Sequence, residues 1–186
     1  MVDPEGSVDA QPRSLAGTPA ASPVGYYSWT LGQAARDPYY IIVVIYIFYP
    51  YFSSTVVGDP VRGQALIGYL GAVGGVLLAL SAPVLGAVAD KHGRRKPWIA
   101  WTVCIMAVGS ACLWFVEPNS SVVSVHQTLL LLLVIIVAFS ISELFHNAML
   151  STIAPANRVG EISGIAFALG SWAGLFLMLF ILIAFA

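Results

Sequence analysis

Charge is scarce in this chain. Only 9% of its 186 residues are charged and 59% are hydrophobic, whereas about a quarter of the residues in ordinary soluble domains are charged. The run from Tyr39 to Gly58 carries no charge and has the length of about 20 residues that a helix needs to cross a bilayer. The sequence therefore predicts an integral membrane protein.

Motifs typical of several other classes of protein are also missing. The chain has no phosphate-binding loop, no His-x-x-x-His or Cys-x-x-Cys spacing for a metal, and no Gly-x-Ser-x-Gly nucleophile turn. Its two cysteines lie eight residues apart in one apolar run, which offers no disulfide framework. A net charge of -1 provides no basic field for nucleic acid. We expect no enzymatic activity, no cofactor, no metal and no nucleic-acid partner.

The apolar runs divide the chain into a tail and a membrane domain. Residues 1–24 are rich in Pro, Ala, Gly and Ser and lack the apolar core of a signal peptide, so we expect a disordered cytoplasmic tail. Residues 25–186 form the membrane domain. Its transmembrane helices are expected at about 28–58, 65–89, 97–116, 125–149 and 162–186. The expected fold class is all-α, with five transmembrane helices.

Basic residues gather on one side of these spans. Four of the eight Lys and Arg residues, Lys91, Arg94, Arg95 and Lys96, lie between the second and third spans. Because cationic loops are retained on the cytoplasmic side, this distribution predicts a cytoplasmic N-terminus. We assign the chain to the plasma (inner) membrane as a multi-pass protein in contact with the lipid bilayer.

The basic loop has an ordered pattern. Gly86 lies one helical turn before Asp90, and Gly93 supplies the freedom for a sharp turn toward the third span. The pattern Gly-x-x-x-Asp-Lys-x-Gly-Arg-Arg resembles the signature loop between helices 2 and 3 of the major facilitator superfamily of secondary transporters. The resemblance implies a cytoplasmic gate that contacts the second half of the transporter. We assign to this gate Gly86, Asp90, Lys91, Gly93, Arg94, Arg95 and Arg158.

Three further stretches resemble one branch of that superfamily, the vacuole-effluxer-like transporters, which include autophagy-related amino-acid effluxers. They are residues 28–52, 147–155 and 158–174. Gln33 stands where this branch often has an acidic residue. The superfamily fold has two six-helix halves, and the five spans correspond to most of the N-terminal half. The resemblance thus implies a fragment of a longer transporter, or a half that is completed by a partner subunit.

Ionisable residues inside the spans are candidates for the substrate or proton cavity, because an uncompensated charge near mid-bilayer is unfavourable. Arg36 and Asp37 precede Pro38, which disfavours helical geometry and removes a backbone donor. One interpretation is a local break that frees carbonyls for a ligand or ion. The other is an ion pair close to the inner interface.

The fourth span carries a polar stripe at helical spacing. Glu143, His146 and Asn147 share this stripe with Ser140, and burial would bring a carboxyl group and an imidazole into the range where they exchange protons. The stripe suits a cation or a proton-coupled solute. Alternatively, Glu143 forms an ion pair with Arg158 or Arg36.

Two functional hypotheses follow. The first is a secondary transporter that moves a small organic solute, with amino acids as one candidate class, by alternating access with a proton or another coupling ion. The second is a non-transporting membrane protein, or half-transporter, that binds a partner through glycine-rich helix faces.

Overall fold

All the long elements of this computed structural model are helices. The structure describes residues 12–92, 95–118 and 123–185, apart from the side chains of residues 89–92. Over these residues, five helices are long and apolar enough to cross a membrane: Pro23–Val56, Pro60–Val88, Lys96–Leu113, Val125–Ile153 and Val159–Phe185. The predicted all-α fold with five spans is confirmed, and the boundaries differ from the predicted ones by a few residues.

The first span is a chain of four helical segments. These are α1 (Pro23–Tyr39), η1 (Tyr40–Phe48), α2 (Tyr49–Tyr51) and η2 (Phe52–Val56). The local break at Pro38, one of the two interpretations of this region, is wrong, because Pro38 lies inside α1 and the Tyr40 amide donates to the carbonyls of Arg36 and Asp37. The backbone instead changes to the wider π-helical winding in η1 and η2, a form that is uncommon outside functional regions.

The other spans are α3 (Pro60–His92), α4 (Lys96–Leu113), α5 (Val125–Ile153) and α6 (Val159–Phe185). Local sequence explains two of their starting points. Asp59 accepts hydrogen bonds from the amides of Val61 and Arg62 at the start of α3. Ser124 and Gln127 form a capping box at the start of α5. Such caps satisfy amides that have no partner inside the helix.

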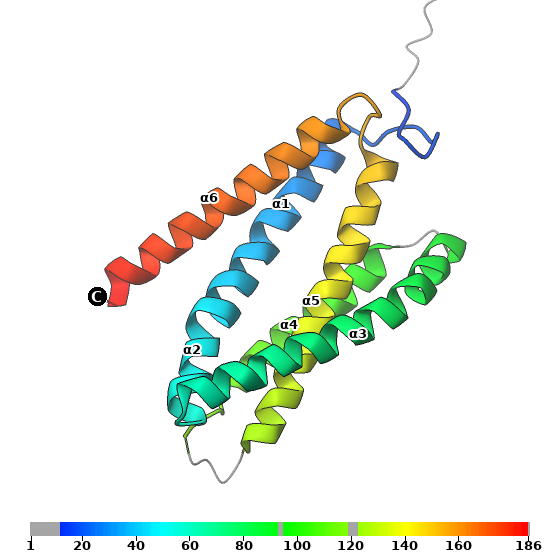
Figure 1. Ribbon diagram of the computed structural model, residues 1–186. Coiled ribbons are helices and arrows are strands. Elements are labelled where there is room, and N and C mark those ends of the chain that lie inside the picture. The colour runs from blue at the N-terminus through cyan, green and yellow to red at the C-terminus, as the bar shows by residue number, and fades with distance from the viewer. Residues whose placement is uncertain (1–11, 93–94, 119–122, 186) are drawn as a thin grey trace, which may run out of the picture.

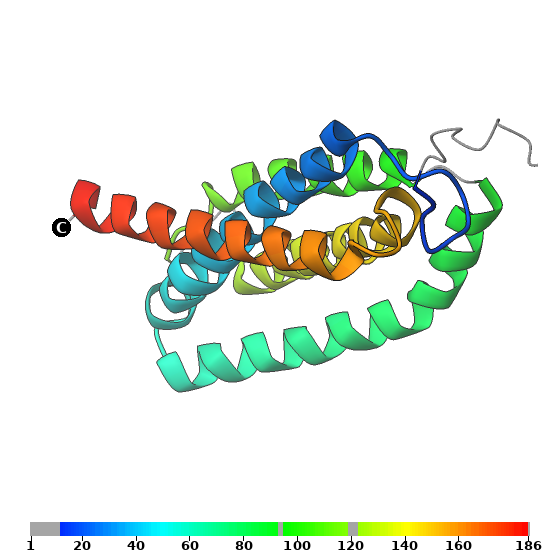
Figure 2. The same cartoon turned by 90° about the horizontal axis from the view of Figure 1, so that it is seen from above.

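The helices surround the pair formed by α1 and α5 (Figure 1). The α6 helix packs along α1, and α1 contacts α5. Figure 2 shows α4 and α3 on opposite sides of α5, and both helices contact it. The α6 helix therefore lies along α1, whereas α3 and α4 lie on opposite sides of α5.

Two apolar clusters lie at opposite ends of this bundle. The first joins the first span, α3, α4 and α5 and consists of Val44, Phe48, Phe52, Leu70, Leu113, Val116, Leu132 and Ile135. The second lies where α1, α5 and α6 meet at the other end and consists of Tyr26, Trp29, Ala154, Ile162 and Ala166. In the first span, Arg36 lies between the residues that belong to the two clusters, and His146 does so in α5. Two polar residues, Arg36 and His146, thus lie between apolar clusters.

The segment before α1 is fastened to the connection between α5 and α6. Residues 13–21, which we call the N-terminal strap, fall within the tail that the sequence predicts to be disordered. The Ala16 amide donates to the carbonyl of Ser151 over 3.1 Å, and the Ala21 amide donates to that of Ile153 over 2.9 Å. These bonds occupy carbonyls at the end of α5 that have no partner within the helix.

Candidate functional site

Arg36 and Asp37 form an ion pair near the midpoint of the first span. Both Nε and Nη2 of Arg36 donate to Oδ1 of Asp37, over 3.0 and 2.8 Å. Arg36 is buried, and its side chain is 7% exposed against 19% for that of Asp37. The first span holds 34 residues, so Arg36 lies about 20 Å along the helix from Pro23. The first span is longer than the roughly 20 residues that a crossing needs, so its length fits both a pair inside the bilayer and a pair near the inner interface.

Arg36 faces the α4 side of α1. Its guanidinium carbon lies 5.5 Å from the centroid of the Phe139 ring on α5, a cation–π geometry. It also lines a cavity of about 320 Å³ between α1 and α4, together with Gly32, Ala35, Tyr39, Val103, Met106, Ala107 and Ser110. The hydroxyl groups of Tyr39 and Ser110 contact each other in this cavity.

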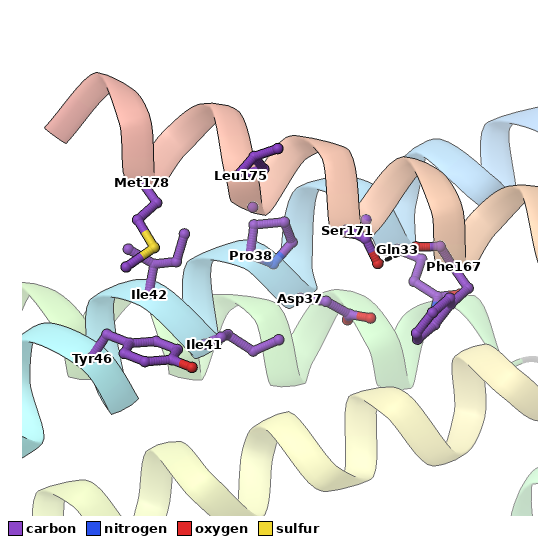
Figure 3. A pocket seen from close by; sticks show the side chains of 12 residues that line it. Gln33, Asp37, Pro38, Ile41, Ile42, Tyr46, Phe167, Ser171, Leu175 and Met178 are labelled. Carbon is purple, nitrogen blue, oxygen red and sulfur yellow. Dashed lines mark hydrogen bonds between the residues drawn. The ribbon is translucent and has the colours of Figure 1, made fainter. Parts of the chain in front are cut away.

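Asp37 faces a different space, which we call the α1–α6 groove. This groove has a volume of about 330 Å³, within the range of about 300 to 1,000 Å³ for small-molecule sites. Its lining consists of Gln33, Asp37, Pro38, Ile41, Ile42 and Tyr46 from the first span and Phe167, Gly170, Ser171, Gly174, Leu175 and Met178 from α6. Figure 3 shows the side chains of Gln33, Asp37 and Ser171 toward one end and Ile42, Tyr46 and Met178 toward the other.

His146 is held against α1 by an aromatic stack. Its ring lies 4.5 Å from that of Trp29, centroid to centroid, with the planes at 12°. The Trp29 indole also donates to the backbone carbonyl of His146 over 2.7 Å. Gly32 allows this approach, because a Cβ atom there would lie 3.3 Å from Cε1 of His146. His146 is only 6% exposed, and its Nε2 atom has no partner among the described residues.

The residues of the predicted polar stripe on α5 differ in burial, and His146 is the buried one among its candidate site residues. Glu143 is half-buried and Asn147 is exposed. On α5, His146 faces α1, and Ile136 faces α3, where it lies beside Gly74. Helical spacing places Glu143 between these two faces. The alternative in which Glu143 pairs with Arg36 or Arg158 is wrong, because those arginines pair with Asp37 and Glu161.

Sequence reasoning missed several residues that shape this region. Trp29, Phe139 and Ser142 are not ionisable, so a search for intramembrane charge does not select them. Ser142 is fully buried, and its hydroxyl has no partner in the part of the chain that the structure describes. Ser142 lies one helical turn before His146, and this spacing could have indicated that the two side chains share a helix face.

The predicted gate residues fall only partly within the described structure. Gly93, Arg94 and the side chains of Asp90 and Lys91 lie outside it. A Cβ atom at Gly86 would meet no atom of the described residues within 4 Å. Arg95 donates from Nη1 to the carbonyl of Ala148 over 2.6 Å, near the C-terminal end of α5, where a cation is favourable.

Arg158 links the start of α6 to α1. It makes two hydrogen bonds to the Glu161 carboxylate, over 2.9 and 2.7 Å, and donates to the Tyr26 hydroxyl over 3.1 Å. Hydrogen bonding to Glu161, followed by that to Tyr27, raises the pKa of the Arg158 guanidinium above its ordinary value. Arg95 and Arg158 therefore reach different helices at the same end of the bundle. Among the described residues, no three His, Cys, Asp or Glu side chains form a potential metal site.

Comparison with known proteins finds a transporter. Over 148 residues the chain is 30% identical to the uncharacterized MFS-type transporter YxiO of Bacillus subtilis (strain 168), and the match covers 77% of this chain and 33% of that protein. The chain thus spans about a third of the length of that relative. No family profile matches the chain, and no solved structure matches it. The similarity supports the major facilitator superfamily and, with the five apolar helices, an integral multi-pass membrane protein.

Proposed function

We propose that this chain forms part of a secondary transporter of the major facilitator type, which moves a small organic solute by alternating access. In such a transporter, the five described helices face a second set of helices, supplied by the same polypeptide or by a partner subunit. The solute binds between the two sets. The vacuole-effluxer-like branch is the part of the superfamily that we propose, and amino acids are the first substrate class to test.

The observation that carries this proposal is the ion pair near the midpoint of the first span. Arg36 is almost fully buried, and it is paired with Asp37 and stacked over Phe139. Charge within a membrane span is costly in hydrocarbon, so it is normally retained for a functional reason. Asp37 borders a groove of about 330 Å³. We place Arg36, Asp37, Glu143, His146 and Asn147 in the cavity, with a proton as the coupling ion to test first.

We further propose that the end of the bundle carrying Arg95 and Arg158 is the cytoplasmic gate, in the plasma (inner) membrane and with a cytoplasmic N-terminus. Arg95 contacts the end of α5, and Arg158 contacts the start of α1. Cations concentrated at one end of a bundle favour that end inside. Asp90 and Arg94 would contact the second half, with Gly86, Lys91 and Gly93 shaping the loop.

The direct test is solute flux by the protein purified from its own membrane, together with any subunit that accompanies it. The protein is reconstituted into liposomes, and uptake of a panel of labelled amino acids and amines is measured with and without an imposed pH gradient. We expect flux of at least one solute, and stimulation by the gradient if a proton is coupled. Absence of flux for the whole panel would contradict the proposal.

Variants locate the site within that assay. Asp37→Asn and Glu143→Gln remove charge while preserving shape, and each should reduce flux by about tenfold or more, since a hydrogen bond to a charged group is worth about 1.5 to 3 kcal/mol. Glu117→Gln is the matched control, because Glu117 is exposed in the connection between α4 and α5. Equal flux in all three variants would refute the cavity assignment.

The second candidate function is partner binding without transport. It is favoured by the glycines of α3 and α6, where a Cβ atom at Gly71, Gly75 or Gly160 would meet no described residue within 4 Å. Such faces allow another helix to approach closely. Copurification of a stoichiometric second membrane protein, combined with absent flux, would favour this function over transport.

A further inference from the structure

The Arg36–Asp37 ion pair is divided between two spaces. Arg36 lines the cavity between α1 and α4 but not the α1–α6 groove, whereas Asp37 lines the groove but not that cavity. Both donors of Arg36 bind Oδ1 of Asp37. The other oxygen, Oδ2, accepts no hydrogen bond from any residue that the structure describes. Among the described residues that line the groove, Asp37 is the charged one, and no arginine or lysine joins it.

We propose that the α1–α6 groove binds a small amphiphilic organic cation, with a primary ammonium group at Asp37 and an apolar body along α6. This inference rests on the proposed transport function and assigns amines, instead of amino acids, to the groove that Asp37 lines. It differs from an amino-acid site, because the described lining has no cation to receive a carboxylate.

Three acceptors lie at one end of the groove (Figure 3). Besides Asp37 Oδ2, the Gln33 side chain supplies an amide oxygen. The Ser171 hydroxyl donates to the carbonyl of Phe167 over 2.9 Å, so its lone pairs remain available as acceptors. A primary ammonium has three N–H donors. The number of acceptors matches the number of donors.

Electrostatics favour a cation despite the neighbouring arginine. An ammonium in hydrogen-bond contact lies about 3 Å from Oδ2, whereas the guanidinium binds the other carboxylate oxygen and turns toward Phe139. Because the Coulomb energy falls with distance, attraction to the nearer carboxylate exceeds repulsion from the arginine. The low polarity around the groove strengthens this difference.

The other end of the groove suits an apolar body. Ile41, Ile42, Leu175 and Met178 line it with aliphatic and thioether groups, and Tyr46 closes it with a ring. Met178 and Leu175 are 51% and 56% exposed, so a ligand can contact them without moving buried side chains. Covering such exposed apolar surface contributes to affinity.

The test measures binding of phenethylammonium to the purified, detergent-solubilised full chain by isothermal titration, with empty micelles as the blank. Phenethyl alcohol replaces the ammonium with a neutral group, and phenylalanine adds a carboxylate. We expect phenethylammonium to bind about ten- to hundredfold more tightly than either analogue, as the loss of a charged hydrogen bond predicts. Equal or tighter binding of phenethyl alcohol or phenylalanine would overturn the proposal, as would no binding of phenethylammonium.

Variants assign that binding to the groove. Asp37→Asn should weaken it about tenfold or more. Because that change also leaves Arg36 without its partner, Gly170→Leu provides a second test that fills the groove and preserves the ion pair. A Cβ atom at Gly170 meets nothing within 4 Å, so α6 should tolerate the substitution. Gly164→Leu is the matched control, since Gly164 is equally open and lies outside the groove lining.

Loss of binding in Gly170→Leu with binding retained in Gly164→Leu would support the site. Unchanged binding in Gly170→Leu would overturn it. The transport proposal and the groove proposal can be refuted by different results. If amines bind but no solute crosses the membrane, the groove is a binding site and the chain is not a transporter. If a solute is transported and phenethylammonium does not compete with it, transport stands and this inference falls.

Discussion

His146 and Trp29 are joined twice, by a ring stack and by a hydrogen bond from the indole to the histidine's own carbonyl. The two residues lie on α5 and α1, and Trp29 is also part of the apolar cluster near the start of α6. One side chain therefore fixes the distance between α1 and α5 and orients the imidazole.

Substitution of Trp29 should separate these two roles. Trp29→Phe keeps an aromatic face but loses the N–H donor, at a cost of about 1 kcal/mol. Trp29→Ala removes both and leaves a cavity, at about 3 to 5 kcal/mol. Thermal unfolding in detergent measures both changes. Trp101→Ala is the control, because Trp101 is 67% exposed. A Trp101→Ala effect as large as that of Trp29→Ala would contradict this account.

A second prediction concerns the contact between the start of α3 and η2. A Cβ atom at Gly63 would lie 2.4 Å from Cα of Ser53, so the clash is with backbone, which cannot rotate away. We expect Gly63→Ala to destabilise the fold by about 1 to 3 kcal/mol. Gly71→Ala, on the same helix with nothing within 4 Å, should be neutral or stabilising by up to about 1 kcal/mol. Similar unfolding temperatures for the two variants would be evidence against this packing.

The spans and the ion pair show where sequence reasoning succeeds and where it stops. Span length and low charge determine that the helices cross a membrane, because the cost of burying charge is large. Because Arg36 and Asp37 are adjacent, an ion pair between them was one of the two interpretations of this region. The sequence did not indicate that the pair is divided between two spaces. That division depends on how α1 is rotated against α4 and α6, and on the π-helical winding that follows Pro38.

The gate prediction was limited for a different reason. Arg95 was assigned to the gate by resemblance to a loop pattern, and Arg158, which lies outside that pattern, was assigned with it. Their contacts include Ala148 and Tyr26 on other helices. A local sequence pattern can indicate which residues lie at one end of the bundle. It does not indicate which residues of other helices their long side chains contact. Those partners follow only from tertiary packing.

The N-terminal strap should be visible in hydrogen exchange. The amides of Ala16 and Ala21 donate to carbonyls of the α5–α6 connection, whereas the Leu15 amide has no partner among the described residues. We expect Ala16 and Ala21 to exchange about tenfold more slowly than Leu15, since bonded amides must open before they exchange. Residue-resolved mass spectrometry or NMR in detergent can measure this. Equal rates at the three amides would mean that the strap is not bound.

The last prediction concerns the fork that Arg158 forms with Glu161. Arg158→Lys keeps the charge but loses the planar pair of donors, so the contact with Tyr26 and the two bonds to Glu161 cannot all persist. We expect faster hydrogen exchange over residues 159–166 in this variant. Glu161→Gln should have a similar but smaller effect, because the bonds from Arg158 to Tyr26 and Tyr27 remain.

The pH dependence of this contact follows from the raised pKa of Arg158. A group whose pKa is higher in the folded protein stabilises it at all pH values below its ordinary pKa, and for arginine that value exceeds about 12. Exchange over residues 159–166, corrected for the intrinsic effect of pH, should therefore be constant from about pH 6 to about pH 9. A loss of protection within that range would show that another titrating group, and not the Arg158 fork, holds α6 against α1.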